Sequence, residues 1–401
     1  MMETYETTKN INGPINIVRL EGKINNIKKV LYVFFDYHVH EKKCADLISL
    51  NIDQYLIREM NKLQKQNTKI NYDYFLEEKV SNAIFQPDQY TYYQPSYIHE
   101  LTQTFHKYRK HIKNTDLSNK IRLHYMDMRM LTVYDAFDYI PNLVKLLHNG
   151  NYTKAFDEID YHIQRIQKLI DILNNPIKPE KSENINLIDM ENENINENFD
   201  KYIKFFNSII YKLKNKYTSS TNQKIINKYI SIIINNFENI VENQIKMLIS
   251  VENMYKLNSK KINKLDCNEL DCGYKQRIFT SFELTSLMEI IYSMKTYYDL
   301  TNVLLTDLYF MRRFIDKDYI TNSVIYTGAS HSVHYIYFLI KYYNFNITNA
   351  YYSKYPLDKL SDKIKHMDLS IKGTFKELQQ IFFPEDFAQC VSLDGFPDLF
   401  L

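Results

Sequence analysis

The segment KKVLYVFFD, residues 28–36, restricts the fold of this chain more than any other feature. It is an almost uninterrupted apolar run rich in Val and aromatic residues, which is typical of a strand buried on both faces of a parallel sheet. Helical patterns follow at 44–66 and 331–344. Other strand-like segments are found at 15–22, 69–77, 120–129, 322–328 and 347–355. This alternation predicts an α/β fold with a largely parallel sheet flanked by helices.

The middle of the chain has a different pattern. Helical periodicity covers 151–173, 201–257 and 280–316. A polar stretch at 181–200, rich in Asn and Glu, predicts a mobile linker. We therefore expect three parts, which are an α/β half at 1–150, a long helical insertion at 151–316 and an α/β return at 317–401 that completes the sheet.

Composition and charge exclude several classes of protein. The 401 residues include 50 basic and 48 acidic side chains, so the net charge of +2 gives no general signal for nucleic-acid binding. There is no apolar signal-peptide core at the start and no run long enough for a membrane span, so we expect a cytoplasmic protein that is not secreted. The cysteines lack a CxxC pair or zinc spacing and are too few for a disulfide framework, which favours a reducing compartment. They are Cys44, Cys267, Cys272 and Cys390.

Ionisable residues follow four of the expected strands. Because ligands bind at the carboxyl ends of parallel strands, these side chains are expected to meet at one edge of the sheet. In order along the chain they are Asp36, His38 and His40, then Glu77 and Glu78, then Asp127 and Arg129, and finally His331 and His334 after Gly328. This convergence is the main sequence evidence for a site.

The residue types suit acid–base chemistry or metal binding. In an extended segment Asp36, His38 and His40 would point the same way, and His with carboxylate serves as an acid–base pair or as metal ligands. Asp127 would orient Arg129, whose guanidinium could bind a substrate anion or a developing oxyanion. The two could instead form a structural ion pair. A divalent metal, Zn or Mn, could be held by His38, Glu77 and His331. His40 could instead be a polar edge residue.

The late strand leads into a helix with two histidines. Gly328 would permit a tight turn that brings the backbone close to a ligand, and Ser330 could cap the helix. His331 and His334 are three apart and share a helical face, although His334 could simply pack against the sheet.

Upstream, Asp307 and Arg312 lie on the helix that leads to this strand. They are either a clamp behind the site or charges on a solvated face.

At these motifs the sequence resembles the erythromycin esterase/TraB/Tiki/ChaN-like superfamily, and it looks closest to uncharacterised members from large DNA viruses. The resemblance covers about 28–130 and 300–355. Phe35 stands where the superfamily usually has Gly, and Asp36 where it usually has Glu. The matching residues are Asp36 and His38 in FDYHVH, Glu77 in FLEEK, Asp127 and Arg129 in YMDMR, and Gly328 and His331 in GASH.

The resemblance implies a peptidase- or esterase-like hydrolase that acts on a small molecule or a peptide in the host cytoplasm or the virion. The superfamily includes metal-dependent peptidases, metal-independent esterases and haem-associated proteins, so a metal is left open. The alternative is a catalytically degenerate binding or structural protein, associated with the virion, whose helical insertion binds a protein partner. DYHVH also resembles the metal-binding opening of amidohydrolase barrels, but that fold needs eight βα repeats, which the helical middle does not supply.

Overall fold

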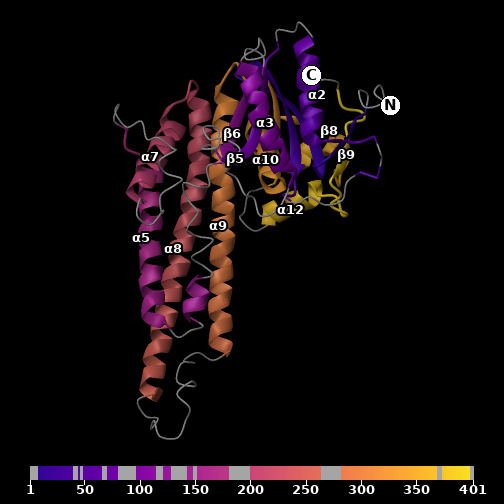
Figure 1. Cartoon of the computed structure of the whole chain (residues 1–401). Helices are drawn as coiled ribbons and strands as arrows, with labels where there is room; N and C mark the ends of the chain where they lie inside the picture. The colour runs from indigo at the N-terminus through magenta and orange to yellow at the C-terminus, as the bar shows by residue number, and fades with distance from the viewer. Residues whose placement is uncertain are drawn as a thin grey trace. The chain divides into compact units, whose positions relative to one another are not determined.

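A computed structural model of the chain places a mixed sheet, a small second sheet and a group of long helices (Figure 1). The structure describes residues 8–38, 44–45, 48–65, 70–79, 96–113, 121–127, 142–147, 151–179, 199–262, 281–367 and 373–397. The chain divides into two compact units. Unit 1 contains residues 1–128 and 306–401, and unit 2 contains residues 129–305. The predicted three-part division at 150 and 316 stays a prediction.

Unit 1 is built on a six-stranded sheet in the order β6-β5-β7-β3-β2-β8. The first four of these strands are mutually parallel, whereas β2 is antiparallel to both β3 and β8. The α/β class and a mostly parallel sheet are thus confirmed. The strands are β2 (Asn16–Ile24), β3 (Ile27–Asp36), β5 (Tyr72–Lys79), β6 (Ile121–Asp127), β7 (Asn322–Gly328) and β8 (Asn346–Ala350).

The strand predicted at 28–36 is β3, one of the two central strands of this sheet, and it is buried. Every residue from Val30 to Asp36 is at most 4% exposed, and β3 has a strand on each side. Tyrosines replace aliphatic residues in much of this core, for example Tyr32 and Tyr74 at 1% exposure. The continuous apolar run therefore belongs to a strand that is buried on both faces, as the sequence predicts.

The second sheet contains β1 (Asn10–Asn12), β4 (Leu50–Asn51) and β9 (Cys390–Ser392). Strand β1 is parallel to β4 and antiparallel to β9. A disulfide between Cys44 and Cys390 joins two segments that are 346 residues apart in the sequence. The cysteines were expected to be too few for a disulfide framework, but this pair is bonded, which removes the reason given for a reducing compartment. Spacing along the sequence says nothing about cysteines that tertiary structure brings together.

The helices of unit 1 include three that the sequence pattern did not reveal, α3, α11 and α12. The helix expected from 44 begins only at Ile52, because Leu50 and Asn51 pair with β1. The helices are α2 (Ile52–Lys65), α3 (Tyr97–Lys113), α10 (Ala329–Tyr343), α11 (Leu357–Lys365) and α12 (Gly373–Phe382).

Unit 2 is helical in the part of it that is described. Helix α5 packs against α7 and α8, and these two also contact each other (Figure 1). Helix α9 belongs to both units, since the boundary falls at Thr306. None of the described helices has an apolar stretch suited to crossing a membrane. Their bounds are α5 (Tyr152–Asn174), α7 (Phe199–Asn215), α8 (Ser220–Ile262) and α9 (Ser281–Asp316).

Candidate functional site

The carboxyl ends of β3, β7 and β5 lie next to one another in unit 1. In register, Asp36 of β3 is opposite Gly328 of β7, and Leu76 of β5 is opposite Tyr326. Glu77 follows Leu76, and its carboxylate is 5% exposed or less, so it is turned into the protein. The strand ends therefore deliver Asp36 and Glu77 to either side of the end of β7.

Asp36 holds the imidazole of His38. The Asp36 Oδ2 atom lies 2.7 Å from His38 Nδ1 and also accepts a hydrogen bond from the His38 backbone N–H at 3.0 Å. The other oxygen, Oδ1, accepts a hydrogen bond of 2.7 Å from the Tyr326 hydroxyl. Asp36 is 1% exposed, whereas the His38 side chain is 47% exposed. The pair thus places an imidazole at the surface on a buried carboxylate.

Asp36 and His38 do meet, but not in the extended segment that the sequence predicted. Strand β3 ends at Asp36, and His38 has φ of +58°, in the left-handed region, so the segment is not extended. His is one of the few residues with a side chain that enters this region with some frequency. The turn folds the imidazole back over the carboxylate two residues earlier.

A second, buried chain of contacts begins at Glu77. Its Oε2 atom accepts hydrogen bonds from Thr327 Oγ1 at 2.9 Å and from the Gly328 backbone N–H at 2.5 Å. Its Oε1 atom lies 3.2 Å from His331 Nε2. On the far side of the ring, His331 Nδ1 lies 2.7 Å from Asp307 Oδ1. His331 therefore sits between two buried carboxylates.

The charge of His331 follows from this position. Burial alone would lower its pKa, but the carboxylates of Glu77 and Asp307 outweigh burial and raise the pKa to about 10. The ring is consequently an imidazolium at neutral pH, and both of its nitrogens donate hydrogen bonds. It neutralises part of the negative charge that Glu77 and Asp307 bring into the interior.

Asp307 is fully buried, so a solvated face is the wrong reading for this residue. Its second oxygen, Oδ2, contacts His334 Nδ1 at 2.9 Å. His334 is 1% exposed and shares Asp307 with His331, as expected for residues on one helical face. Arg312 lies on the same helix and is partly buried, and its role in a clamp stays a prediction.

Gly328 is required for a different reason from the one predicted. Its φ is −51°, which any residue can adopt, so no special turn is involved. A Cβ at this position would lie 2.5 Å from His38 Nε2 and 3.1 Å from Glu77 Oε2. Glycine therefore leaves the space in which the two groups approach each other, and these two atoms are 3.6 Å apart.

The predicted cap at Ser330 is wrong. Helix α10 begins at Ala329, its N-cap residue is Gly328, and no side chain caps it. The nearest hydrogen bond of Ser330 is a long one of 3.5 Å from Gln379.

Residues 9–401 match a protein family described as a family of unknown function, DUF5847. The chain belongs to DUF5847. Its relatives include "Uncharacterized protein R706" of Acanthamoeba polyphaga mimivirus, which is 29% identical over 97% of this chain and 96% of the relative. "Uncharacterized protein R161" of the same virus is 27% identical over 97% of this chain and 98% of its own length. No solved structure matches significantly. The two mimivirus proteins confirm the expected viral relatives, while the wider superfamily stays a resemblance.

Other residues that were predicted for the site either have no contact with it among those given above or lie outside the described residues. Asp127 ends β6, the edge strand, opposite Lys79 of β5. Arg129, His40 and the side chain of Glu78 lie outside the described residues. The structure therefore brings together Asp36, His38, Glu77, Gly328, His331, His334 and Asp307, and their functional roles stay predictions.

The described residues hold no group of three or more His, Cys, Asp or Glu side chains suited to a metal ion. The predicted Zn or Mn site at His38, Glu77 and His331 is thus not supported. Both ring nitrogens of His331 already lie within contact distance of carboxylates, Glu77 on one side and Asp307 on the other.

Sequence reasoning missed Tyr326 and Thr327 of this DUF5847 site. Tyr326 binds Asp36, and Thr327 binds Glu77, and both are buried. A signal was present, because Thr327 is a polar residue that follows the apolar run 324–326, directly before Gly328. Asp307 was named from the sequence as one of two alternatives, a clamp or a solvated charge, but its contact with His331, 24 residues later, could not be foreseen from a position in a long helix.

Proposed function

We propose that the site at the carboxyl edge of the sheet hydrolyses a carboxylic ester or amide, with His38 as the general base. The observation that carries this proposal is the pairing of a half-exposed imidazole with a buried carboxylate, Asp36, beside a second buried carboxylate, Glu77. Such a pair is the usual arrangement for activating water or another nucleophile.

The contacts of His38 define its role. With Nδ1 against the Asp36 carboxylate, the neutral ring carries its proton on Nδ1, and Nε2 accepts a proton from water. The oxygen of that water bonds to the substrate carbonyl carbon. The proton on Nε2 then passes to the leaving alcohol or amine as the carbon–oxygen or carbon–nitrogen bond breaks. Tyr326 holds Asp36 in place for this cycle.

Glu77 would stabilise the charge that develops on His38. When Nε2 is protonated, the imidazolium lies 3.6 Å from Glu77 Oε2 as well as 2.7 Å from Asp36. The buried imidazolium of His331, held by Asp307, keeps Glu77 in its position. Arg129, predicted from its motif, would stabilise the oxyanion of the tetrahedral intermediate, with Asp127 orienting it.

The resemblance to the erythromycin esterase/TraB/Tiki/ChaN-like superfamily supports the same reaction class. Of its two branches of hydrolase, the contacts favour one without a metal, since both nitrogens of His331 contact carboxylates, those of Glu77 and Asp307. The substrate would then be a small-molecule ester or a peptide bond, and the chain would act in the host cytoplasm or the virion.

A panel of carboxylic esters, lactones and short peptides tests this proposal. His38→Gln should lower kcat/KM for any substrate found by roughly 10²–10⁴-fold, because general-base catalysis contributes about that much. Histidine 366 offers a matched control, since the side chain of His366 is 75% exposed on another helix. His366→Gln should leave turnover unchanged.

Two results would contradict the proposal. One is undiminished turnover in His38→Gln for a substrate that the wild type hydrolyses. The other is loss of activity on treatment with a chelator, because the proposed mechanism uses no metal and a chelator should leave activity unchanged. If activity is lost on chelation and restored by Zn²⁺ or Mn²⁺, the reaction runs through a metal and not through this base alone.

A second candidate, a degenerate binding or structural protein, is favoured by Phe35. This residue stands where the superfamily usually has Gly, and its fully buried ring contacts those of Phe382 and Phe383 at centroid distances of 6.0 and 6.4 Å. The space that glycine would leave is therefore filled. If Phe35→Gly confers or raises hydrolysis that the wild type lacks, the wild type is the degenerate form.

A further inference from the structure

A pocket of about 550 Å³ opens in unit 1 beyond the end of β8. Its lining includes Tyr351, Tyr352, Glu385, Asp386 and Cys390. Strand β8 runs in the same direction as β3, because both are antiparallel to β2. The pocket therefore follows the carboxyl end of β8, on the same edge of the sheet as Asp36 and Gly328.

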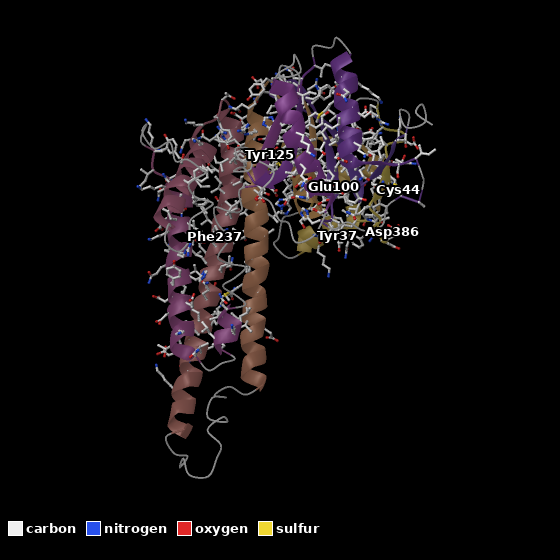
Figure 2. All side chains as sticks on the ribbon, in the orientation of Figure 1. Tyr37, Cys44, Glu100, Tyr125, Phe237 and Asp386 are labelled. Atoms are coloured by element: carbon white, nitrogen blue, oxygen red, sulfur yellow. A yellow bond between two sulfur atoms is a disulfide. The ribbon has the colours of Figure 1, made fainter. Side chains whose placement is uncertain are left out.

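An aromatic pair connects this pocket to the candidate site. Phe387 lies between Asp386 and Ala388, which both line the pocket, and its ring packs against that of Tyr37, with 5.0 Å between centroids and the planes tilted by 32°. Tyr37 is the residue between Asp36 and His38. Both rings are exposed, Tyr37 at 45% and Phe387 at 37%, and Figure 2 shows Tyr37 and Asp386 on the same side of the unit. An apolar surface thus runs from the general base to the pocket.

The walls of the pocket are held by contacts outside it. Cys390 is fixed to Cys44 by the disulfide, and the Tyr351 backbone N–H donates a hydrogen bond of 2.9 Å to the carbonyl of Ile17. The Asp386 side chain accepts one of 3.2 Å from the Ala388 N–H, which sets its orientation. The pocket is therefore formed before a ligand enters, and its volume is in the range of sites for small molecules.

The lining selects for positive charge. Tyr351 and Tyr352 line the pocket, and the faces of tyrosine rings are electron-rich and attract ammonium and guanidinium groups. Glu385 and Asp386 are both exposed acids that would pair with such a group. Rings and carboxylates around one cavity of this size recognise a cation, and they disfavour an anionic ligand.

We propose that this pocket is a recognition subsite for a cationic group, an ammonium or a guanidinium, of the substrate that His38 hydrolyses. That the ligand is a substrate rests on the proposed hydrolase function, but binding of a cation to the pocket can be measured without any turnover. The Tyr37–Phe387 surface would accommodate the apolar part of the ligand between the cation and the bond that is cleaved.

Two small probes of similar shape test the subsite, phenethylammonium and its neutral counterpart 2-phenylethanol. Binding to the full-length protein is measured by NMR titration at low salt. We expect the wild type to bind the cation on the order of tenfold more tightly, from one cation–π contact and two exposed ion pairs. The preference should shrink as salt is raised, because salt screens exposed charges.

The decisive variant is the double substitution Glu385→Gln with Asp386→Asn, which should abolish the preference for the cation. Asparagine keeps the oxygen that accepts from Ala388. The matched control is Asp358→Asn with Asp362→Asn, which removes the same charge from exposed positions on α11. In that control the preference should persist. Tyr351→Ala should weaken binding of the cation more than that of 2-phenylethanol.

The outcomes separate this subsite from the hydrolase proposal. Equal binding of both probes by the wild type overturns the subsite, and so does a preference that survives in the double variant or is lost equally in the control. If the preference follows the expected pattern while His38→Gln leaves turnover unchanged, the hydrolase mechanism fails and the cation site stands. If turnover depends on His38 but the preference is absent, only the subsite fails.

Discussion

Gly328 shows how a single side-chain hydrogen can be a requirement of the site. The glycine is not needed for its backbone angles, since φ is −51°. It is needed because His38 Nε2 and Glu77 Oε2 occupy the volume around its α-carbon. The same residue donates its N–H to Glu77. A methyl group here would displace the side chains of His38 and Glu77 and would disturb the site more than the fold.

Gly328→Ala is therefore expected to lower kcat/KM by roughly 10²-fold, the effect of displacing a catalytic group by about 1 Å. The thermal midpoint should change little, because the half-exposed ring of His38 can move away. Measurement of kcat/KM and thermal unfolding checks both parts. Ser330→Ala, two residues on, is the control and should leave both values near wild type. A Gly328→Ala enzyme with unchanged kcat/KM would refute the steric role of this position.

At the scale of elements, His331 connects three of them. It lies on α10, contacts Glu77 of β5 and contacts Asp307 of α9. An imidazolium between two carboxylates stabilises the folded chain only while it is protonated. Its pKa is raised from 6.5 to about 10, so this stabilisation is complete below pH 6.5 and is lost as pH rises toward 10.

The free energy of unfolding of the wild type should consequently fall between about pH 6.5 and pH 10 relative to that of His331→Gln. Urea unfolding of both proteins at pH 6, 8 and 10 measures the difference, which should be largest at pH 6. NMR titration of His331 in the wild type provides a second measurement that needs no variant. A ring that titrates near its ordinary pKa, or a stability difference that is constant with pH, would rule out the buried imidazolium.

At the scale of the whole molecule, the disulfide links the segment that follows His38 to strand β9. Cys44 and Cys390 are 346 residues apart, so the bond closes a very large loop in the unfolded chain. Cross-links of this kind stabilise proteins mainly by restricting the unfolded state. Cys390 also lines the pocket beside the site. The bond thus contributes to stability and to the shape of the pocket.

The double variant Cys44→Ser with Cys390→Ser should lose about 2–5 kcal/mol of unfolding free energy, the usual value for a native disulfide. Chemical unfolding with and without a reductant measures this loss. Reduced wild type should match the variant, and the variant should not respond to the reductant. Equal stability of the oxidised wild type and the variant would show that the cross-link does not stabilise the fold.

Part of the fold could be predicted from the local pattern of apolar and polar residues. Strands β3 and β7 and helix α10 were expected within a few residues of their observed bounds, because apolar runs and helical spacing are local properties. Helices α3 and α11 and the short strands β1 and β4 were missed. Short elements carry little pattern of their own, and β1 and β4 are strands because of pairing with distant segments, β1 with both β4 and β9.

The candidate site was predictable to the extent that it depends on strand ends. Once a sheet is mostly parallel, the carboxyl ends of its strands meet, so Asp36, Glu77 and Gly328 could be grouped from sequence alone. The details could not. The left-handed turn at His38 and the steric role of Gly328 depend on atoms that are near in space and distant in the chain.

By itself the sequence determined which segments form the buried strands, because alternation and apolar runs are set by the solvent that each face meets. It also determined which chemical groups stand at the strand ends. Tertiary structure alone decided that Asp307 becomes the buried partner of His331 and His334, and that Cys44 meets Cys390. Burial and proximity are properties of the packed chain, and they decide whether an acid is solvated or enclosed, and whether a cysteine is single or paired.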